Sequence, residues 1–441
     1  MQEYFYQLAD YLTALLHGNE VSMSSFSAED SDFVRFNRSA VRQAGTVMQR
    51  YLSLSLINGM RHSEGTITVS GDFALDCEHA AQILTSLREK LSYLPDDPHL
   101  LYATEVRSTE HHGKNQLPEE SAAIVAAILE AGRGRDLVGF YAAGGIHNGF
   151  ANSFGQRNWF SSYSYNFDWS FYHQGDKAVK ESYAGFVWDP TEFAHKVETA
   201  AAELTVLAQP PRTIEPGRYC VYLAPAALAE IVGLLHWGGF GLKDHRTKQT
   251  TLLKMSENGA RLHPGVSMSE NTTDGVAPNF QDAGFIKPDR VLLIDKGAFR
   301  ECLISPRSAK EYGVPTNGAG DGEMPESIDV AAGDIPADDV VHQLDTGVYI
   351  NNLWYLNYSD RPACRITGMT RFATFWVENG RIAAPLNVMR FDETLYRMLG
   401  ENLLGFTGER GLILDAGTYG GRSTSSSRIP GALVKDFTFT L

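Results

Sequence analysis

The sequence predicts an α+β protein with an N-terminal α+β domain over residues 1–210 and a β-rich C-terminal domain over residues 211–441. Three observations lead to this prediction. The chain has 441 residues, which is more than one hydrophobic core usually serves. In the first half, the spacing of apolar residues switches between helical and strand periods. In the second half, short apolar runs are separated by Gly, Pro, Asn and Asp, a pattern typical of strands.

The N-terminal segment is expected to form a helix that ends at Gly18, because five apolar residues recur at helical spacing: Phe5, Leu8, Leu12, Leu15 and Leu16. Antiparallel strands are expected next, over 32–38, 46–57 and 66–70, with turns at Asn58-Gly59 and Glu64-Gly65. Helical spacing returns over 76–92. A further helix is predicted over 118–132, where Pro118, Glu119 and Glu120 suit a first turn.

Residues 136–188 are predicted to form aromatic-rich strands with a hairpin tip over 155–158. Apolar and polar residues alternate from Phe160 to Tyr165, which predicts a sheet with one buried face. A helix over 191–208 precedes Pro210-Pro211, the predicted domain boundary. The second domain is expected to open with a strand over 217–223 and a helix over 225–237. Residues 313–338, rich in Gly, Pro and acidic residues, are expected to form a long surface connection.

Composition excludes several classes of protein. The net charge of -15 argues against a general affinity for nucleic acid, since Lys and Arg supply that attraction. No run approaches 18 apolar residues, so no membrane-spanning helix is expected. No Lys or Arg precedes Arg35, so a signal peptide is not expected either. The four cysteines are isolated from one another, which favours reduced thiols and a cytoplasmic location.

Generic catalytic motifs are missing: the sequence has no GxxxxGK[ST], GxSxG or HExxH. Two features remain as candidates. His236 follows an apolar helix, where a packed or capping histidine is a more common role than a metal ligand. Trp159 and Tyr163 belong to a run of aromatic residues that could line a groove for an extended peptide. The same aromatics could equally fill the buried face of a sheet.

Longer stretches of the sequence resemble the TldD/PmbA family. Asn152-Ser153-Phe154-Gly155 is similar to the family's "NS-x-G" segment, and 280–284 to its acidic turn. The strongest resemblance is an ordered C-terminal series that covers 346–350, 353–355, 367–371 and 375–380 and is extended by Pro385 and Arg390-Phe391. These segments resemble the family's "GlyI…LWY…TGlTR…F-x-IENG" pattern, and the resemblance spans most of 136–440.

The resemblance implies a cytoplasmic metallopeptidase, a hydrolase that cuts peptides or unstructured proteins; some members are called modulators of DNA gyrase. Catalytic TldD-type members carry HExxxH and a Cys near the chain end, which would hold zinc, with the Glu as general base. Here Trp237 falls at the position of the Glu and Gly241 at that of the second His, and 415–419 contains no Cys. Ala283 and Phe372-Ala373 are two further departures. The chain therefore resembles the PmbA/TldE type, which lacks the metal site.

We accordingly predict no catalytic residue, no metal ligand and no cofactor in this chain, and expect zinc only in a TldD-type partner. The chain is expected to form a dimer with that partner or with itself and to act on a peptide, with no nucleic-acid or membrane partner. Alternatives are a stand-alone peptide-binding or regulatory protein, and a peptidase with an unrecognised site. Tentative residues of a substrate groove are Trp159, Tyr163, His236 and Arg371.

Overall fold

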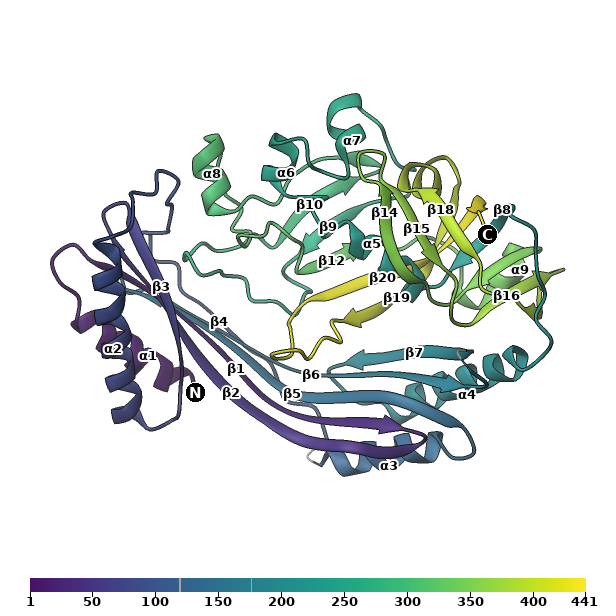
Figure 1. Cartoon of the computed structure of the whole chain (residues 1–441), viewed down its shortest axis with the longest axis horizontal. Coiled ribbons are helices and arrows are strands. Elements are labelled where there is room, and N and C mark those ends of the chain that lie inside the picture. The colour runs from purple at the N-terminus through teal and green to yellow at the C-terminus, as the bar shows by residue number, and fades with distance from the viewer. Residues whose placement is uncertain (119, 176) are drawn as a thin grey trace.

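The computed structural model describes residues 1–118, 120–175 and 177–441. Its strands form two sheets, one from each half of the chain (Figure 1). Helices lie with the first sheet, and the second half is rich in strands, so the α+β prediction is confirmed. The boundary at Pro210-Pro211 stays a prediction. No helix within these residues is long and apolar enough to cross a membrane.

The first half contains the following helices and strands: α1 Gln2–Ala14, β1 Val21–Asn37, β2 Ala40–Asn58, β3 Arg61–Thr68, α2 Phe73–Leu91, β4 Thr109–His112, α3 Ser121–Ala131, β5 Asp136–Asn152, β6 Arg157–Tyr172, β7 Ala178–Gly185 and α4 Pro190–Leu207. The first sheet has the order β3-β2-β1-β5-β6-β4, with β7 also beside β6. Glu119, which was expected in the first turn of α3, lies outside the described residues.

Two expectations about the first sheet are wrong. Strand β1 begins at Val21, not near residue 32, because its Ser-rich opening lacks the apolar alternation that signals a strand. The turn expected at Glu64-Gly65 lies inside β3, where Gly65 pairs with Leu54. Glycine at position 65 allows α2 to pack closely against β3 and does not form a turn. A Cβ at this position would lie 2.5 Å from Ile83 Cδ1 of α2. The turn at Asn58-Gly59 is confirmed, with Gly59 at φ 63°.

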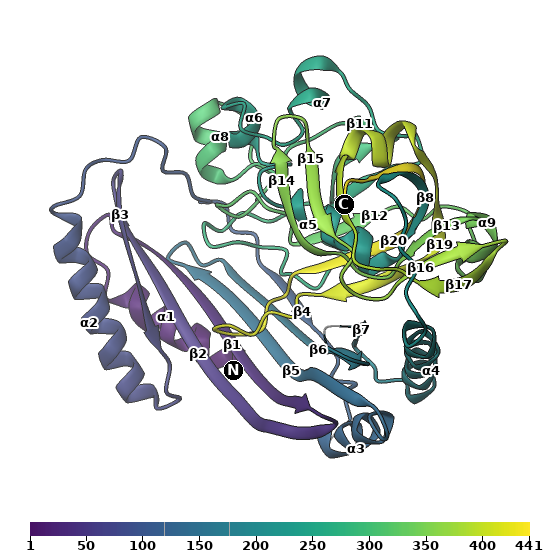
Figure 2. The ribbon, with the colours of Figure 1, turned by 45° about the vertical axis from the view of Figure 1, so that its right-hand side comes forward.

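Successive side chains of a strand point to opposite faces of its sheet, and the first sheet therefore has two different surfaces. Its helix face carries the buried aromatics. Phe26 and Trp159 pack with α1 and α2, and Phe167 and Trp169 pack with residues of α3 and α4. Its inner face is turned toward the second half of the chain, where Phe160 packs against Phe280. Figures 1 and 2 show the long strands running beneath the second half.

The second half contains β8 Gly217–Leu223, α5 Pro225–Leu234, α6 Leu242–Arg246, α7 Leu253–Asn258, β9 Met268–Asn271, β10 Arg290–Asp295, β11 Ala298–Phe299, α8 Pro306–Tyr312, β12 Ser327–Val330, η1 Ala337–Asp339, α9 Val340–Leu344, β13 Gly347–Ile350, β14 Trp354–Asp360, β15 Arg365–Met369, β16 Thr374–Glu378, β17 Arg381–Pro385, β18 Arg390–Thr394, η2 Arg397–Glu401, β19 Leu403–Leu414 and β20 Ser426–Phe439. The main path of its sheet is β11-β10-β9-β12-β20-β8-β13-β16-β17.

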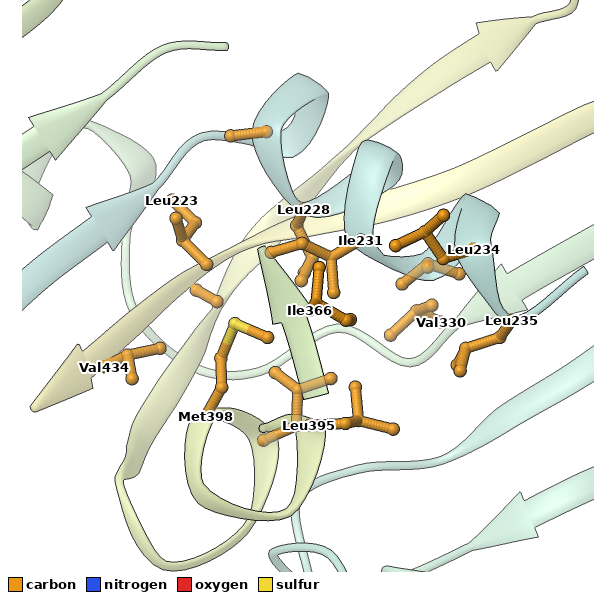
Figure 3. Close-up of a cluster of buried hydrophobic side chains, with 14 of the residues drawn as sticks. Leu223, Leu228, Ile231, Leu234, Leu235, Val330, Ile366, Leu395, Met398 and Val434 are labelled. Carbon is orange, nitrogen blue, oxygen red and sulfur yellow. The ribbon is translucent and has the colours of Figure 1, made fainter. Parts of the chain in front are cut away.

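The expectation of a surface connection over 313–338 is wrong at β12. This strand is buried and lies between β9 and β20 in the second sheet. Four residues flanked by Gly, Pro and acidic residues are too few to give a strand period, which is why the sequence pattern missed it. The core of the second half surrounds α5, where Leu228, Ile231 and Leu235 meet Ile366 and Leu395 (Figure 3).

Candidate functional site

The position that corresponds to the zinc motif lies just after helix α5. Pro225 opens this helix, and its buried Leu228 and Ile231 fix it against the core. The helix ends at Leu234, three residues before the expected end, so His236 follows it in a turn. Burial lowers the pKa of His236, and its Nε2 atom has no hydrogen-bond partner within the described chain. The imidazole is therefore neutral at physiological pH.

The residues around His236 do not fit a zinc ion. Trp237, at the position of the general base, is 58% exposed, and its carbonyl accepts a hydrogen bond from Arg361. Gly241, at the position of the second His, pairs with Leu303 as an isolated β-bridge. In the described residues, no group of three or more His, Cys, Asp or Glu side chains is arranged to hold a metal ion. Catalytic zinc usually requires three protein ligands, and one neutral imidazole does not supply them.

The segment 415–425, between β19 and β20, reaches onto the inner face of the first sheet; we call it the strap (Figure 2). Gln49 donates a hydrogen bond to the Gly420 carbonyl at 2.8 Å, and the Arg422 amide donates to Glu29 Oε2 at 3.0 Å. Asp415–Tyr419, where the resemblance would place a ligand Cys, thus belongs to a segment that contacts β1 and β2.

Arg422 is the main anchor of the strap. Its guanidinium donates to the hydroxyl of Ser31 at 3.2 Å, the carbonyl of Gly144 at 3.3 Å and both oxygens of Ser164 at 2.7 and 2.9 Å. Burial lowers the pKa of Arg422, whereas the Glu29 carboxylate opposes that shift. These bonds join three strands of the first sheet to the last hairpin of the second.

The inner face of the first sheet is lined by small polar side chains. The register places Ser27 opposite Asn148, and Asn148 opposite Phe160. Further along the same face lie Ser162, Ser164, Asn166 and Asp168 of β6. Hydroxyl and amide groups can both donate and accept hydrogen bonds, as the backbone of an extended peptide requires. Ser162, Ser164 and Asn166 are buried, whereas Ser27 and Asn148 are accessible, so the part of this face around Ser27 and Asn148 is chemically suited to contact peptide backbone.

A cleft of about 360 Å³ lies at the β3 end of this face. It is lined by residues of both halves of the chain, among them Ser53, Ser55, His62, Asp97 and Arg307. Burial alone would raise the pKa of Asp97, but hydrogen bonds from Arg307, the His99 amide and His62 outweigh it and lower the pKa to about 2. The Asp97 carboxylate is therefore ionised and bound in an ion pair with Arg307, and it has no feature of a general base.

The four predicted groove residues do not meet at one surface. Trp159 is 3% exposed and stacks with Phe26 on the helix face. Tyr163 lies on that face too, edge-on to His147. His236 lies at the end of α5, and the Arg371 guanidinium lies 5.0 Å from the ring centre of Trp354. Their role in substrate binding stays a prediction. The sequence did not indicate the Ser and Asn residues of the inner face as candidate binding residues, although it shows them alternating with aromatics along β6.

The fold defines a class of two-part α+β proteins. In this class, helices cover one face of a long-stranded sheet, and a second, β-rich half covers the other face. The chain belongs to the PmbA/TldD family, because the model of the PmbA/TldA metallopeptidase C-terminal domain matches residues 216–441, which are 226 of its 441 residues. No curated protein matches the sequence.

Solved structures of low sequence identity share the whole fold. TldE from Thermococcus kodakarensis is 13% identical with a TM-score of 0.79, over 99% of this chain and 100% of that chain. A protein from Thermotoga maritima, described as a candidate modulator of a DNA gyrase, is 14% identical with a TM-score of 0.76 over 99% and 100% of the two chains. A similarly described protein from Bacteroides thetaiotaomicron is 16% identical, with a TM-score of 0.72 over 99% and 98%.

Proposed function

We propose that this chain is the zinc-lacking, PmbA/TldE-type subunit of a two-subunit peptidase. A TldD-type partner would supply HExxxH, the zinc ion and the general base, while this chain would help bind and position the peptide. The observation that carries the proposal is the polar inner face of the first sheet, together with a zinc position that retains one imidazole.

Positioning is a sufficient role for such a subunit. Holding an extended peptide near an activated water converts a bimolecular encounter into an oriented one, which can contribute several kcal/mol to the rate. Ser27 and Asn148 offer hydrogen bonds to a peptide backbone without the bulk that would block a strand-like chain. Water activation, in contrast, would need a metal or a base, and Trp237 offers neither.

Assembly with a partner is supported by the outer edge of β2. Strand β3 pairs only with Tyr51–Asn58, so the described chain places no strand on the outer side of 40–49. Such an edge exposes unpaired backbone groups that a second chain can bind. We expect a homo- or heterodimer that buries well over roughly 1,000 Å². Sedimentation that finds only monomer, alone and with a TldD-type protein, would contradict it.

A cytoplasmic location is part of the same proposal. All four cysteines are free, with Cys77 and Cys364 buried, as is common for proteins of a reducing compartment.

Peptide cleavage tests the proposal directly. An unstructured peptide is incubated with this chain, with a TldD-type HExxxH protein, and with both, each with and without a chelator. We expect no cleavage by this chain alone and a chelator-sensitive rate for the mixture that exceeds the rate of the partner alone. Chelator-sensitive cleavage by this chain alone would contradict the proposal. If the TldD-type protein cleaved the peptide at the same rate with and without this chain, the proposed subunit role would be wrong. The alternative role of a stand-alone binding protein would then remain.

A further inference from the structure

A second hollow, of about 500 Å³, lies on the inner face at the end opposite the cleft. Strands β1, β2, β5, β6 and β7 form its floor, and Ala416 and Thr418 of the strap also line it. The anchored part of the strap, which bonds to Glu29, Ser31 and Gln49, lies between this hollow and the cleft near Arg307. Neither the zinc chemistry of the family nor the ion pairs of the fold account for it.

Three cations from three different strands converge on this hollow: Arg35 of β1, Arg42 of β2 and Lys180 of β7. Within the described ranges, none of them forms an ion pair. The Arg35 guanidinium lies 5.9 Å from the ring centre of Phe140, and Lys180 Nζ lies 5.7 Å from that of Phe372. Unpaired cations gathered in a chain of net charge -15 create a local positive field that attracts an anion.

Arg371, a predicted groove residue, is linked to this hollow through aromatic contacts. The Arg371 guanidinium lies over the ring of Trp354, and this ring meets that of Phe372 edge-on with the centres 5.8 Å apart. Lys180 Nζ lies over the ring of Phe372. A fourth cation of the second half is thus close to the same end of the inner face.

Asp168 is the one carboxyl group that lines the hollow, and its Oδ2 atom is buried without a hydrogen-bond partner in the described chain. An unpartnered acceptor beside unpaired cations is costly in an empty hollow, unless a ligand or water supplies the missing bond. Protonated, Asp168 could donate to a carboxylate oxygen.

We propose that this hollow is a carboxylate-binding subsite for acidic peptides, in which Arg35, Arg42 and Lys180 hold the anion. The inference rests on the proposed peptide-binding role and specifies its substrate class. The polar strands would bind the peptide backbone, and the three cations would select a peptide with a carboxylate at this end. The carboxylate could belong to an Asp or Glu side chain or to the peptide's C-terminus.

Three fluorescent ten-residue peptides of Gly, Ser and Gln separate these sources. One carries two Glu residues and an amidated C-terminus, the second has no Glu and a free C-terminus, and the third is neutral with an amidated C-terminus. Binding to the whole chain is measured by fluorescence anisotropy. We expect one or both carboxylate peptides to bind roughly tenfold more tightly than the neutral peptide, as two or three partly exposed ion pairs would give.

The double variant Arg35→Gln/Arg42→Gln should bring the ratio of the affinity for a carboxylate peptide to the affinity for the neutral peptide close to one. Binding of the neutral peptide should not be reduced. Its matched control, Arg218→Gln/Arg381→Gln, changes two exposed arginines away from the hollow and should keep the preference. Lys180→Gln is a second test from another strand, should the double variant not fold by circular dichroism.

A pH series adds an independent readout. Burial, opposed by Lys180, raises the pKa of Asp168 to about 6. Protonation removes a negative charge from the hollow, so the preference for the Glu peptide should rise from pH 7.5 to 5.5, and Asp168→Asn should flatten the rise. The charged or polar groups that face Asp168 from neighbouring elements are Arg35, Arg42, Lys180, Asn166 and Asp415 of the strap.

Equal binding of all three peptides would overturn the carboxylate subsite and leave the peptide-binding role intact. Absence of binding by every peptide would overturn both. Stronger competition by a ten-nucleotide oligothymidine than by the Glu peptide would also overturn the proposal, because the hollow would then recognise phosphate.

Discussion

The two faces of the first sheet are made from the same strands, yet they differ in almost every respect. On the helix face, large aromatics such as Trp159, Phe167 and Trp169 are buried under helices. On the inner face, the intervening positions of β6 are Ser162, Ser164 and Asn166. The helix face has the composition of a core, and the burial of its large aromatics stabilises the fold. Part of this polarity serves the fold, because Ser164 accepts hydrogen bonds from Arg422 of the strap. Ser27 and Asn148 are not fully buried and are inner-face residues available to a ligand or to water.

Trp159→Ala should show the largest effect in this comparison. The substitution removes a buried aromatic that packs against Phe26 and α1, and it should lower the free energy of unfolding by about 3–5 kcal/mol. Urea denaturation measures the change. Ser162→Ala, three residues further along β6 and on the inner face, should change it by less than about 1 kcal/mol. Similar losses for both variants would break the distinction between the two faces.

The helix face also contains a buried acidic pair, Glu203 and Glu181. Glu203 of α4 accepts a hydrogen bond from Asn351 at 2.9 Å, and Glu181 of β7 lies beside it. Burial raises the pKa of Glu203 to about 8, and the charge of Glu181 adds to the shift. The folded state therefore holds a proton that the unfolded state releases above about pH 4.5.

The sign of the pH effect follows from that proton. Between about pH 4.5 and 8 the folded chain binds more protons than the unfolded chain, so stability falls as pH rises. The loss should be on the order of 2–4 kcal/mol over this range. Glu203→Gln mimics the protonated form and should remove most of this slope in urea midpoints recorded from pH 5 to 8. A slope unchanged by the substitution would show that Glu203 is not its source.

Arg422→Gln tests the anchor of the strap on the inner face. Loss of the charged hydrogen bonds to Ser31, Gly144 and Ser164 should cost about 1–3 kcal/mol of stability. Exchange of backbone amides for deuterium should accelerate in 415–425 and leave α1 and α2 unaffected. If the strap stayed protected in this variant, its other contacts, such as that of Gln49 with Gly420, would be the actual anchor.

The smallest effect on stability is expected at the centre of the inner face. Ser27→Ala/Asn148→Ala removes two polar groups that face each other across β1 and β5 and are not fully buried. The free energy of unfolding should stay within about 0.5 kcal/mol of the original value. Peptide affinity should nevertheless fall several-fold in the anisotropy assay. Unchanged affinity would show that backbone binding does not involve these side chains.

Much of the fold could be predicted from sequence because apolar periodicity is local. The helices α1, α2 and α4 follow from it, within a few residues at each end. The segment 136–188 was predicted as aromatic-rich strands and contains β5, β6 and β7, although β6 begins at Arg157, inside the predicted hairpin tip over 155–158. The Ser-rich start of β1 and the short β12 could not, since their strand conformation depends on neighbours far along the chain. Gly65 illustrates the same limit, because the side chain that requires a glycine belongs to α2.

The candidate site was less predictable than the fold. The unusual residues at the zinc position, Trp237 and Gly241, could be read from the resemblance. The hollow near Arg35 could not, because Lys180 lies more than 130 residues beyond Arg35 and Arg42 in the sequence and meets them only in the folded sheet.

The central claim is that this chain binds peptide on the inner face of its first sheet. Photo-crosslinking tests it most directly, with an extended acidic peptide that carries benzoylphenylalanine at its centre, mapped by mass spectrometry. The account predicts adducts on inner-face segments around Ser27, Gln49 and Asn148 or on the strap, suppressed by excess unlabelled peptide. Specific adducts confined to α1, α2 or the outer surface of the second half would contradict it.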